Sequence, residues 1–502
     1  MDQEYSSQVY AKASEFTSEL NYELKEVAVI LAAGHGKRIK SNRSKMLHTI
    51  WGIPTVQRVY NACNSKNFEM NTVIVVGIKA LDVIEVFGKR DKVAFAYQEN
   101  QLGTGHAVQI GLEKINKEKF DGIIYVFPGD MGLIDSKTVN LFRESFKSSG
   151  SDMMVLTGQY EGDVSKNSYG RIVRVKDKDV EGADSGEDFN KVIEIIEHKD
   201  ILAIDPHTPY ITEYNGKKYS FSRQELIENR EYNSGVYAFD SKKLNELVFS
   251  ISSENAQKEL YITDLIGIFN KAGYSVDAVS PEEEYVVMGF NDKTVLKEME
   301  KLHQKIVYDK LKNIIEIEDP SDFFIEEEIV EEILELDAIG IPLDIYIGKG
   351  TRIGRGVKIN YGLNIRRGGN INGNIIFGKN VKVSDRVWLS TFPHQTFTIG
   401  DDVQISWGDI IKGNITIGNG TKIESSVNMT GSDEFPLIIG SNVLIKGTSY
   451  IFGSVIEDDI QIEHSVIINK TVRRQVRRDG TVQPVKFYLP MPSGIDIIED
   501  ID

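Results

Sequence analysis

A six-residue apolar repeat in the C-terminal part of the chain restricts its fold more than any other feature. The repeat positions are Ile347, Ile353, Ile359, Ile365, Ile371, Phe377, Val383 and Leu389, then Ile399, Ile405, Ile411, Ile417, Ile423 and Met429, then Ile439, Ile445 and Ile451, and finally Ile456, Ile462 and Ile468. An α-helix, with about 3.6 residues per turn, cannot keep one face through steps of six. A parallel β-helix can, because each coil stacks its aliphatic residue on the coil below. The repeat therefore predicts a β-helix over residues 345–471, with loops projecting near 390–398 and 430–438.

The residues before this repeat follow a pattern typical of α/β proteins. Short continuous apolar runs occur at Val27–Leu31, Thr72–Gly77 and Gly122–Phe127, separated by stretches long enough to hold helices. Such runs predict buried parallel strands in an open sheet with helices on both faces. Ligands of these sheets bind beyond the carboxyl ends of the strands, where the Gly34 loop and Asp130 would lie.

The two patterns are separated by a helical segment and a strongly acidic one. Residues 316–337 include eleven acidic side chains and no basic ones, which is typical of a solvated linker. The expected organisation is a polar N-terminal leader over 1–25, an α/β domain over 26–293, a linker helix and acidic connector over 294–344, the β-helix over 345–471 and a C-terminal tail over 472–502.

Charge and cysteine content exclude several classes of protein. With 58 basic and 75 acidic residues the net charge is −17, which argues against nucleic acid or an anionic membrane as partner. The single cysteine, Cys63, excludes an internal disulfide and a cysteine-built zinc site. No apolar run is long enough to span a membrane, and the N-terminus lacks the pattern of a signal peptide. We therefore expect a cytoplasmic protein.

Small and cationic residues follow the first predicted strand. The string Leu31–Arg38 contains two glycines, and Lys45 follows it closely. Small residues let backbone N–H groups approach a phosphate or a base, and Arg38 and Lys45 supply positive charge. A plain tight turn is the alternative for the glycines alone.

With Lys45 and Gly52-Ile53-Pro54, this string resembles the signature of sugar-1-phosphate nucleotidyltransferases. The segment Gln98–Ala107 is similar to the uracil-binding loop of bacterial N-acetylglucosamine-1-phosphate uridyltransferases of the bifunctional uridyltransferase/acetyltransferase type. Further matching motifs occur in order at Pro128–Asp130, Tyr169–Ile172, Glu197–Asp200, Asn233–Gly235 and Tyr261–Asp264. The resemblance implies a Rossmann-like nucleotidyltransferase domain, a left-handed parallel β-helix of hexapeptide repeats, and a homotrimer assembled through that β-helix.

The resemblance also implies an enzyme that forms UDP-N-acetylglucosamine and pyrophosphate from UTP and N-acetylglucosamine 1-phosphate. Catalysis would use Arg38 and Lys45; nucleotide binding Leu31, Ala32, Ala33, Gly34, Gln98, Gly103 and Thr104; sugar binding Pro128, Gly129, Gly170, Glu197 and Asn233; and magnesium binding Asp130 and Asn291. Taken singly, Asp130 could be a helix cap, Glu197 a surface charge and Asn233 a turn residue. The alternative substrate is another sugar 1-phosphate such as glucose 1-phosphate.

The second half of the chain departs from the family pattern. Gly408 stands where the acetyltransferase histidine belongs, and Met429-Thr430-Gly431-Ser432 replaces an Asn-Tyr-Asp-Gly loop. His394 is the only candidate for the general base. We therefore expect no acetyltransferase, although a bifunctional enzyme, an acyltransferase and a nonenzymatic sensor remain as alternatives. Two apparent insertions, Val180–Phe189 and Pro206–Arg230, could shape the sugar pocket or lie on the surface as loops.

Overall fold

The computed structural model describes residues 3–34, 36, 39–253 and 258–488. The chain divides into two compact units, residues 1–300 and 301–502, and the division falls within helix α10 (Lys293–Leu311). Within the described ranges, no helix combines the length and the hydropathy needed to cross a membrane.

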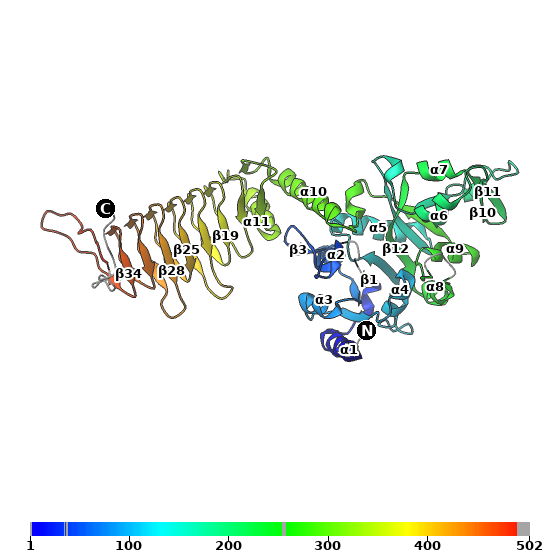
Figure 1. Cartoon of the computed structure of the whole chain (residues 1–502), viewed down its shortest axis with the longest axis horizontal. Helices are drawn as coiled ribbons and strands as arrows, with labels where there is room; N and C mark the ends of the chain where they lie inside the picture. Colours follow the sequence, from blue (N-terminus) through cyan, green and yellow to red (C-terminus); the bar gives the residue numbers. More distant parts are fainter. Residues whose placement is uncertain (1–2, 35, 37–38, 254–257, 489–502) are drawn as a thin grey trace, which may run out of the picture. The chain divides into compact units, whose positions relative to one another are not determined.

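The N-terminal unit is built on one mixed sheet (Figure 1). Along its main path the strands, in spatial order, are β13 (Val276–Val279), β7 (Met153–Gln159), β12 (Glu231–Asp240), β6 (Ile123–Pro128), β1 (Glu26–Ala32), β4 (Asn71–Val76) and β5 (Val93–Tyr97). Two further strands branch from β12, which pairs with β8 (Arg171–Arg174), and β8 pairs with β9 (Val192–Ile196). Strands β6, β1, β4 and β5 are parallel, and β12 is antiparallel to both of its neighbours, β6 and β7. The predicted α/β sheet is confirmed.

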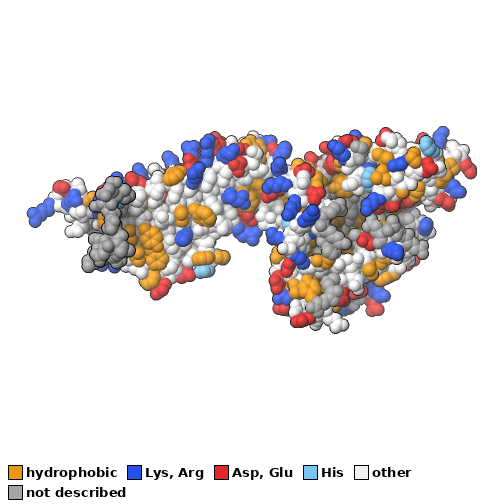
Figure 2. All heavy atoms as spheres, in the orientation of Figure 1, with side chains coloured by type: hydrophobic (Ala, Val, Ile, Leu, Met, Phe, Trp, Pro, Cys, Tyr) orange, Lys and Arg blue, Asp and Glu red, His pale blue; other side chains and the backbone are white. Residues whose placement is uncertain are grey.

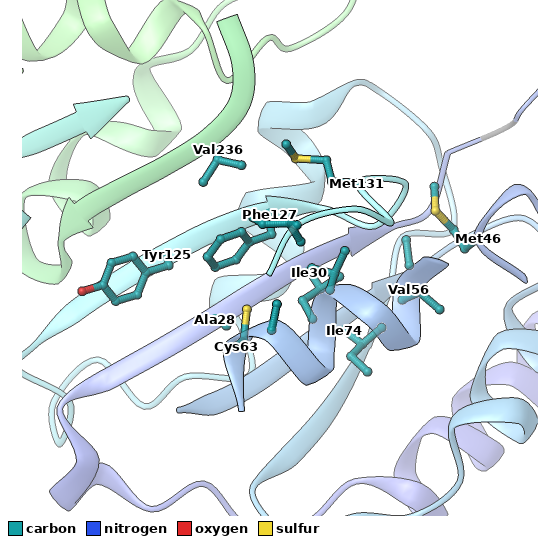
Figure 3. Packing of buried hydrophobic residues seen from close by; sticks show 14 of the residues in the cluster. Ala28, Ile30, Met46, Val56, Cys63, Ile74, Tyr125, Phe127, Met131 and Val236 are labelled. Carbon is teal, nitrogen blue, oxygen red and sulfur yellow. The ribbon is translucent and has the colours of Figure 1, made fainter. Parts of the chain in front are cut away.

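Helices cover both faces of this sheet because successive residues of a strand point to opposite sides. In β1, Ala28 and Ile30 enter one core cluster and Val27 and Val29 the other. Figure 3 shows the first cluster, in which Ala28 and Ile30 lie beside Cys63 of helix α2. That face carries α1 (Gln3–Phe16), α2 (Thr55–Cys63), α3 (Ala80–Phe87) and α5 (Ser136–Ser149). The other face carries α4 (Thr104–Leu112), α8 (Ser241–Leu247) and α9 (Asp264–Lys271).

The two apparent insertions belong to a smaller lobe with its own core. The lobe contains β8 (Arg171–Arg174), β9 (Val192–Ile196), α6 (His198–Ala203), the hairpin β10 (Tyr210–Tyr214) and β11 (Lys217–Phe221), and α7 (Arg223–Glu228). Val175, Ile193, Tyr219 and Leu226 are among the side chains buried there. A short antiparallel pair elsewhere, β2 (Thr49–Ile50) with β3 (Ile53–Pro54), leads into α2.

Over its described residues the C-terminal unit contains three parallel sheets, which confirms the predicted β-helix. One sheet contains β14 (Glu316–Ile317), β16 (Tyr346–Ile347), β18 (Asn364–Ile365), β21 (Lys382–Val383), β24 (Gln404–Ile405), β27 (Lys422–Ile423), β30 (Leu444–Ile445) and β33 (Gln461–Ile462). The second contains β15 (Phe323–Ile325), β17 (Thr351–Ile353), β19 (Asn370–Asn372), β22 (Trp388–Ser390), β25 (Ile410–Gly413), β28 (Asn428–Gly431), β31 (Tyr450–Phe452) and β34 (Val466–Ile468). The third contains β20 (Ile375–Phe377), β23 (Phe397–Ile399), β26 (Ile415–Ile417), β29 (Leu437–Ile439), β32 (Val455–Ile456) and β35 (Thr471–Val472).

The repeat positions from Ile347 to Ile462 are buried, but the last one is not. Ile468 is 38% exposed, and Ile467 takes the interior place, pairing with Ile451. The prediction for Ile468 was therefore wrong. The final step is five residues long instead of six, because its left-handed residue, His464 (φ +38°), comes one position earlier than the corresponding Thr448 (φ +60°) of the preceding coil.

The acidic segment is also different from the expected solvated linker. Its strands β14 and β15 pair with β16 and β17, so the stacked sheets begin before residue 345. Its helix α11 (Glu327–Asp337) buries Ile329, Val330 and Ile333. Three of the acidic side chains form ion pairs with basic residues of the following coils. The pairs are Glu318 with Arg367, Glu326 with Arg355 and Glu332 with Lys358.

The two expected loops leave the coils after β22 and β28 and contact each other. His394 Nε2 lies 2.9 Å from Asp433 Oδ2, and Gln395 Nε2 donates to Asp433 Oδ1 at 2.8 Å. Both His394 and Asp433 are more than half exposed. After β35 the tail forms a bridge between Val476 and Val482 and returns to pair Val485 with Ile462.

Asp409 is an acidic residue buried within the β-helix. Its side chain is fully buried. Its backbone carbonyl accepts a hydrogen bond from the Trp388 amide of one adjacent coil, and its carboxyl group contacts Val427 of the other. Oδ1 accepts a hydrogen bond from the Val427 amide at 2.8 Å, whereas Oδ2 has no hydrogen-bond partner among the described residues. Burial raises the pKa of Asp409 to about 8, because the charged form loses its hydration.

This environment predicts a pH-dependent effect of Asp409→Asn. Between about pH 4 and pH 8 the folded chain retains a proton that the unfolded chain releases, so the wild type loses stability as the pH rises through this window. Asparagine carries no such cost. We expect equal melting temperatures for variant and wild type near pH 4, and a variant that melts a few degrees higher above pH 8. Calorimetry at several pH values measures the difference.

The control is Asp402→Asn, which changes an exposed carboxylate of the same β-helix. An Asp409→Asn variant whose melting temperature differs from that of the wild type by the same amount at every pH would contradict the assignment.

Candidate active site

The carboxyl ends of β1, β4 and β6 approach one another closely enough to require small residues. The Gly129 amide donates to the Leu31 carbonyl at 3.0 Å, directly after β6. A Cβ atom on Gly77, at the end of β4, would lie 2.7 Å from the Ala33 carbonyl oxygen. Ala32 and Ala33 are buried, and Gly34 is exposed at the edge of the sheet. Arg38, the other predicted catalytic residue of this loop, lies outside the described residues.

Lys45 joins the two predicted metal ligands. It begins the short 3₁₀ helix η3 (Lys45–Leu47), and its side chain is only 9% exposed. Its Nζ lies 2.5 Å from Asp130 Oδ2 and donates to Asn291 Oδ1 at 3.1 Å. The ring of Phe290, fully buried, lies below this ammonium with its centroid 5.3 Å away. Residues from three distant parts of the sequence thus converge on one positive charge.

The chemistry of Asp130 and Asn291 suits a divalent cation. Carboxylate and amide oxygens are hard donors of the kind that Mg²⁺ prefers. Asp130 and Asn291 both direct an oxygen at one cationic group, the Lys45 ammonium. Over the described ranges no group of three or more His, Cys, Asp or Glu side chains could hold a metal. The residues therefore fit an ion that completes its coordination with substrate phosphates and water.

The electrostatic environment changes sign across the site. Near Lys45, burial and the positive charges of Arg43 and Lys293 hold the pKa of His48 below its usual value. At Glu197, burial, with smaller effects of Asp200 and Asp264, raises the pKa of the carboxyl group. Arg43 and Lys293 thus act on the Lys45 end of the site, and the carboxylates Asp200 and Asp264 act on the Glu197 end.

Gln98 is held in one orientation by the loop that follows it. Its side chain is almost fully buried, and its Nε2 donates to the Gly103 carbonyl at 3.0 Å and lies 3.1 Å from His106 Nδ1. Because a carbonyl can only accept, the amide nitrogen must face Gly103. The loop itself packs on the backbone of Leu260, which accepts from the Gly105 amide and donates to the Leu102 carbonyl. The hydroxyl of Thr104 accepts from the Ile262 amide at 3.2 Å.

Three of the predicted sugar-binding residues form a second group. The backbone N–H of Asn233 donates to the Gly170 carbonyl at 2.9 Å. A Cβ on Gly170 would lie 3.2 Å from Glu197 Oε1. Asn233 Oδ1 accepts from the Tyr237 hydroxyl at 3.0 Å, which fixes the amide at an irregularity of β12. Pro128 lies beside this group, since a Cβ on Gly235 would be 3.0 Å from its ring.

Sequence reasoning missed several residues that position these groups. Gly77 is needed for the approach to Ala33, Leu260 for the loop after Gln98, and Tyr237 for the orientation of Asn233. Gly77 ends a predicted strand and could have been found from that signal. Leu260 acts only through its backbone, and no sequence pattern reports that.

Comparison with known proteins assigns the family. Residues 28–196 match the MobA-like NTP transferase domain. The bifunctional protein GlmU of Acetivibrio thermocellus is 31% identical over 505 residues, a match that covers 91% of this chain and 97% of that protein. The chain belongs to the GlmU family. The GlmU proteins of Clostridium tetani and Geobacillus thermodenitrificans are each 33% identical, over 61% and 58% of their lengths. The N-terminal unit of this GlmU-family protein is accordingly a nucleotidyltransferase domain.

Gly103→Ala should destabilise the loop after Gln98. Gly103 has φ +113°, and an added Cβ would lie 2.5 Å from the Leu260 carbonyl oxygen, so backbone must move against backbone. We expect a loss of about 1–3 kcal/mol beyond that of the control, measured by chemical denaturation. The control, Gly150→Ala, has φ +67° with no atom within 4 Å, so it measures the cost of an alanine at a positive φ without a clash. Equal losses in both variants would show that the loop does not pack on Leu260 as described.

Proposed function

We propose that this protein is a magnesium-dependent uridylyltransferase that forms UDP-N-acetylglucosamine and pyrophosphate from UTP and N-acetylglucosamine 1-phosphate. The observation that carries the proposal is the convergence of Lys45, Asp130 and Asn291 beside the Gly34 loop. A protein that only bound a sugar nucleotide would not need metal ligands and a phosphate-binding cation at one point. Membership of the GlmU family supports the same reaction class.

In the proposed reaction, a phosphate oxygen of the sugar 1-phosphate forms a bond to the α-phosphorus of UTP. The bond from that phosphorus to the bridging oxygen breaks, and pyrophosphate leaves with the electron pair. Such transfers depend on positioning and on neutralising charge more than on covalent catalysis. Bound Mg²⁺, held by Asp130 and Asn291, would supply charge neutralisation on the phosphates.

The protein's own groups would align the two substrates and neutralise their charge. Lys45, placed between Asp130 and Asn291, would turn its ammonium to the triphosphate, with Arg38 as a second cation. The backbone from Leu31 to Gly34 would lie against the nucleotide. The backbone of Leu31 and Ala32 is held by the sheet before substrate arrives, which lowers the cost of organising the transition state.

Gln98 would select uracil. Its Nε2 is engaged by the Gly103 carbonyl and His106, which leaves Oε1 as an acceptor for the base. The N3 atom of uracil carries a hydrogen and can donate to it, whereas N3 of cytosine is itself an acceptor. Thr104 and Gly103 would complete this part of the site by holding the loop.

Gly170, Glu197 and Asn233 would bind the sugar, with Pro128 and Gly129 beside them. A carboxylate and a side-chain amide provide acceptors and a donor for hydroxyl and N-acetyl groups. Glucose 1-phosphate is the alternative substrate, because the same groups can also bind hydroxyls.

The β-helix would serve assembly and not acetyl transfer. Gly408, which replaces the expected histidine, occupies a left-handed corner with φ +73° and offers no side chain. His394, the remaining candidate base, is exposed and paired with Asp433. We therefore propose a single-activity enzyme, while its relatives carry the name bifunctional.

The decisive experiment measures pyrophosphate release from UTP and Mg²⁺ with N-acetylglucosamine 1-phosphate, glucose 1-phosphate or glucosamine 1-phosphate. We expect turnover with the acetylated sugar, and no rescue of glucosamine 1-phosphate by acetyl-CoA. Asp130→Ala should reduce turnover at least about 100-fold, since it removes a metal ligand. Asp121→Ala, which changes an exposed carboxylate before β6, is the matched control.

Preference for glucose 1-phosphate would refute the substrate and keep the reaction class. Acetyl-CoA-dependent rescue would show that the β-helix is catalytic. Full activity of Asp130→Ala, or activity without metal, would overturn the mechanism.

A homotrimer is the proposed assembly, and the outer surface of the β-helix supports it. Figure 2 shows hydrophobic side chains gathered over the coils. On the second sheet Trp388 pairs in register with Ile410, and both are exposed; on the third, Ile376 and Ile438 are exposed. The first sheet instead presents polar residues such as Lys382, Gln404 and Lys422. Exposed apolar rows on adjacent faces suit packing against further copies of the chain.

Ile410→Glu should weaken this assembly. The full-length wild type is expected to sediment with the mass of three chains, and the variant as smaller species, because a charge would be buried in the interface. Gln404→Glu, on the polar sheet, is the control and should leave the mass unchanged. A monomeric wild type would end the trimer proposal.

A further inference from the structure

Helix α1 is anchored at the edge of the main sheet beside β5. Val9 and Ala13 are buried in the core cluster shared with α3. The chain that follows α1 continues onto the strand edge, where the Ser18 amide donates to the Val93 carbonyl at 2.8 Å. Thr17 Oγ1 accepts from the Phe95 amide at 3.0 Å. These bonds satisfy polar groups of an edge strand and fix where α1 lies.

Two side chains of α1 contact the residues on either side of Gln98. The Tyr10 ring meets the Tyr97 ring edge to face, with centroids 5.2 Å apart. Ser6, which is buried, donates from Oγ to Glu99 Oε1 at 2.6 Å. Tyr97 is the last residue of β5, and Glu99 begins the loop that leads to Gly103. The contacts therefore bracket Gln98 in the sequence.

The other contacts of Gln98 come from the main sheet and from the segment that follows it. The backbone N–H of Gln98 continues the sheet by donating to the Val76 carbonyl at 2.8 Å, and its side-chain nitrogen is held by Gly103 and His106. The direction of the Gln98 side chain therefore depends on the path of the loop from Glu99 to Gly103. At the start of that path, Ser6 provides the hydrogen bond to the Glu99 carboxylate. A hydrogen bond to a charged acceptor is among the stronger ones.

We propose that α1 is a positioning element for the nucleotide base, in which Ser6 and Tyr10 hold Glu99 and Tyr97 so that Gln98 is fixed before UTP binds. This inference rests on the proposed function, because it takes Gln98 as the residue that reads the base. A loop ordered in advance does not have to be ordered by the ligand, and affinity rises accordingly. Loss of the contacts should therefore weaken UTP binding and the discrimination between UTP and CTP, and leave the chemical step intact.

The test compares Ser6→Ala and Tyr10→Ala with Ser7→Ala in the full-length protein. Ser7 neighbours Ser6 on α1 but is exposed, so its replacement removes the same hydroxyl with no bond to Glu99. We expect the KM for UTP to rise about three- to tenfold in Ser6→Ala and Tyr10→Ala. Their kcat and their KM for the sugar 1-phosphate should stay at the wild-type values, and the preference for UTP over CTP should fall. Ser6→Thr, which keeps the hydroxyl, should restore the KM.

Each other outcome overturns the inference. KM values for UTP that match that of Ser7→Ala would show that the contacts do not position the base. A fall in kcat in proportion to lost thermal stability, with KM unchanged, would show that α1 only stabilises the fold. If the wild type turned over no UTP with any sugar 1-phosphate, the proposed function itself would fail, which is a distinguishable result.

Discussion

The parallel pairing of β1 with both β4 and β6 is the constraint on which the site depends. Leu31 is in register with Val75 on one side and Pro128 on the other, so all three strands end at the same edge. The segments that leave this edge must separate at once, and Ala33, Gly77 and Gly129 are small where they meet. Asp130 is placed by the turn after β6 and Lys45 by the segment after β1. The pairing of neighbouring strands therefore brings the Asp130 carboxylate and the Lys45 ammonium together.

Much of this arrangement could be predicted from local sequence. Continuous apolar runs identified β1, β4 and β6, and the rule that ligands bind at carboxyl ends placed Gly34 and Asp130 at one edge. Asn291 could not be placed by such reasoning. It precedes α10, far along the chain from Asp130, and no periodicity reports which loop returns to the edge of a sheet. Its contact with Lys45 is a product of tertiary packing.

The same limit applies to α1 and to the acidic segment. The N-terminal residues are polar in composition, and their few buried side chains are too sparse to distinguish a docked helix from a frayed one. Glu318 and Glu326 form a dense negative run when counted along the sequence, yet their partners Arg367 and Arg355 lie in later coils. A charge pattern read along the chain cannot show pairing between coils. The six-residue period succeeded because stacking repeats the same contact at a fixed interval.

One corner of the β-helix restricts which amino-acid residues the domain can accept there. In successive coils the corner residue has a left-handed backbone. These residues are Gly362, Asn380, Asp402, Gly420, Asn442 and Asp459. Glycine, asparagine and aspartate enter that conformation at the lowest cost, so the corner accepts few other residues. Chain length between corners can grow by an excursion, as the loop containing His394 does, but a single extra residue within a strand would displace the corner from its column. At this corner the residue type is therefore restricted, and longer additions to the domain are carried by loops that project from the coils, such as the one containing His394.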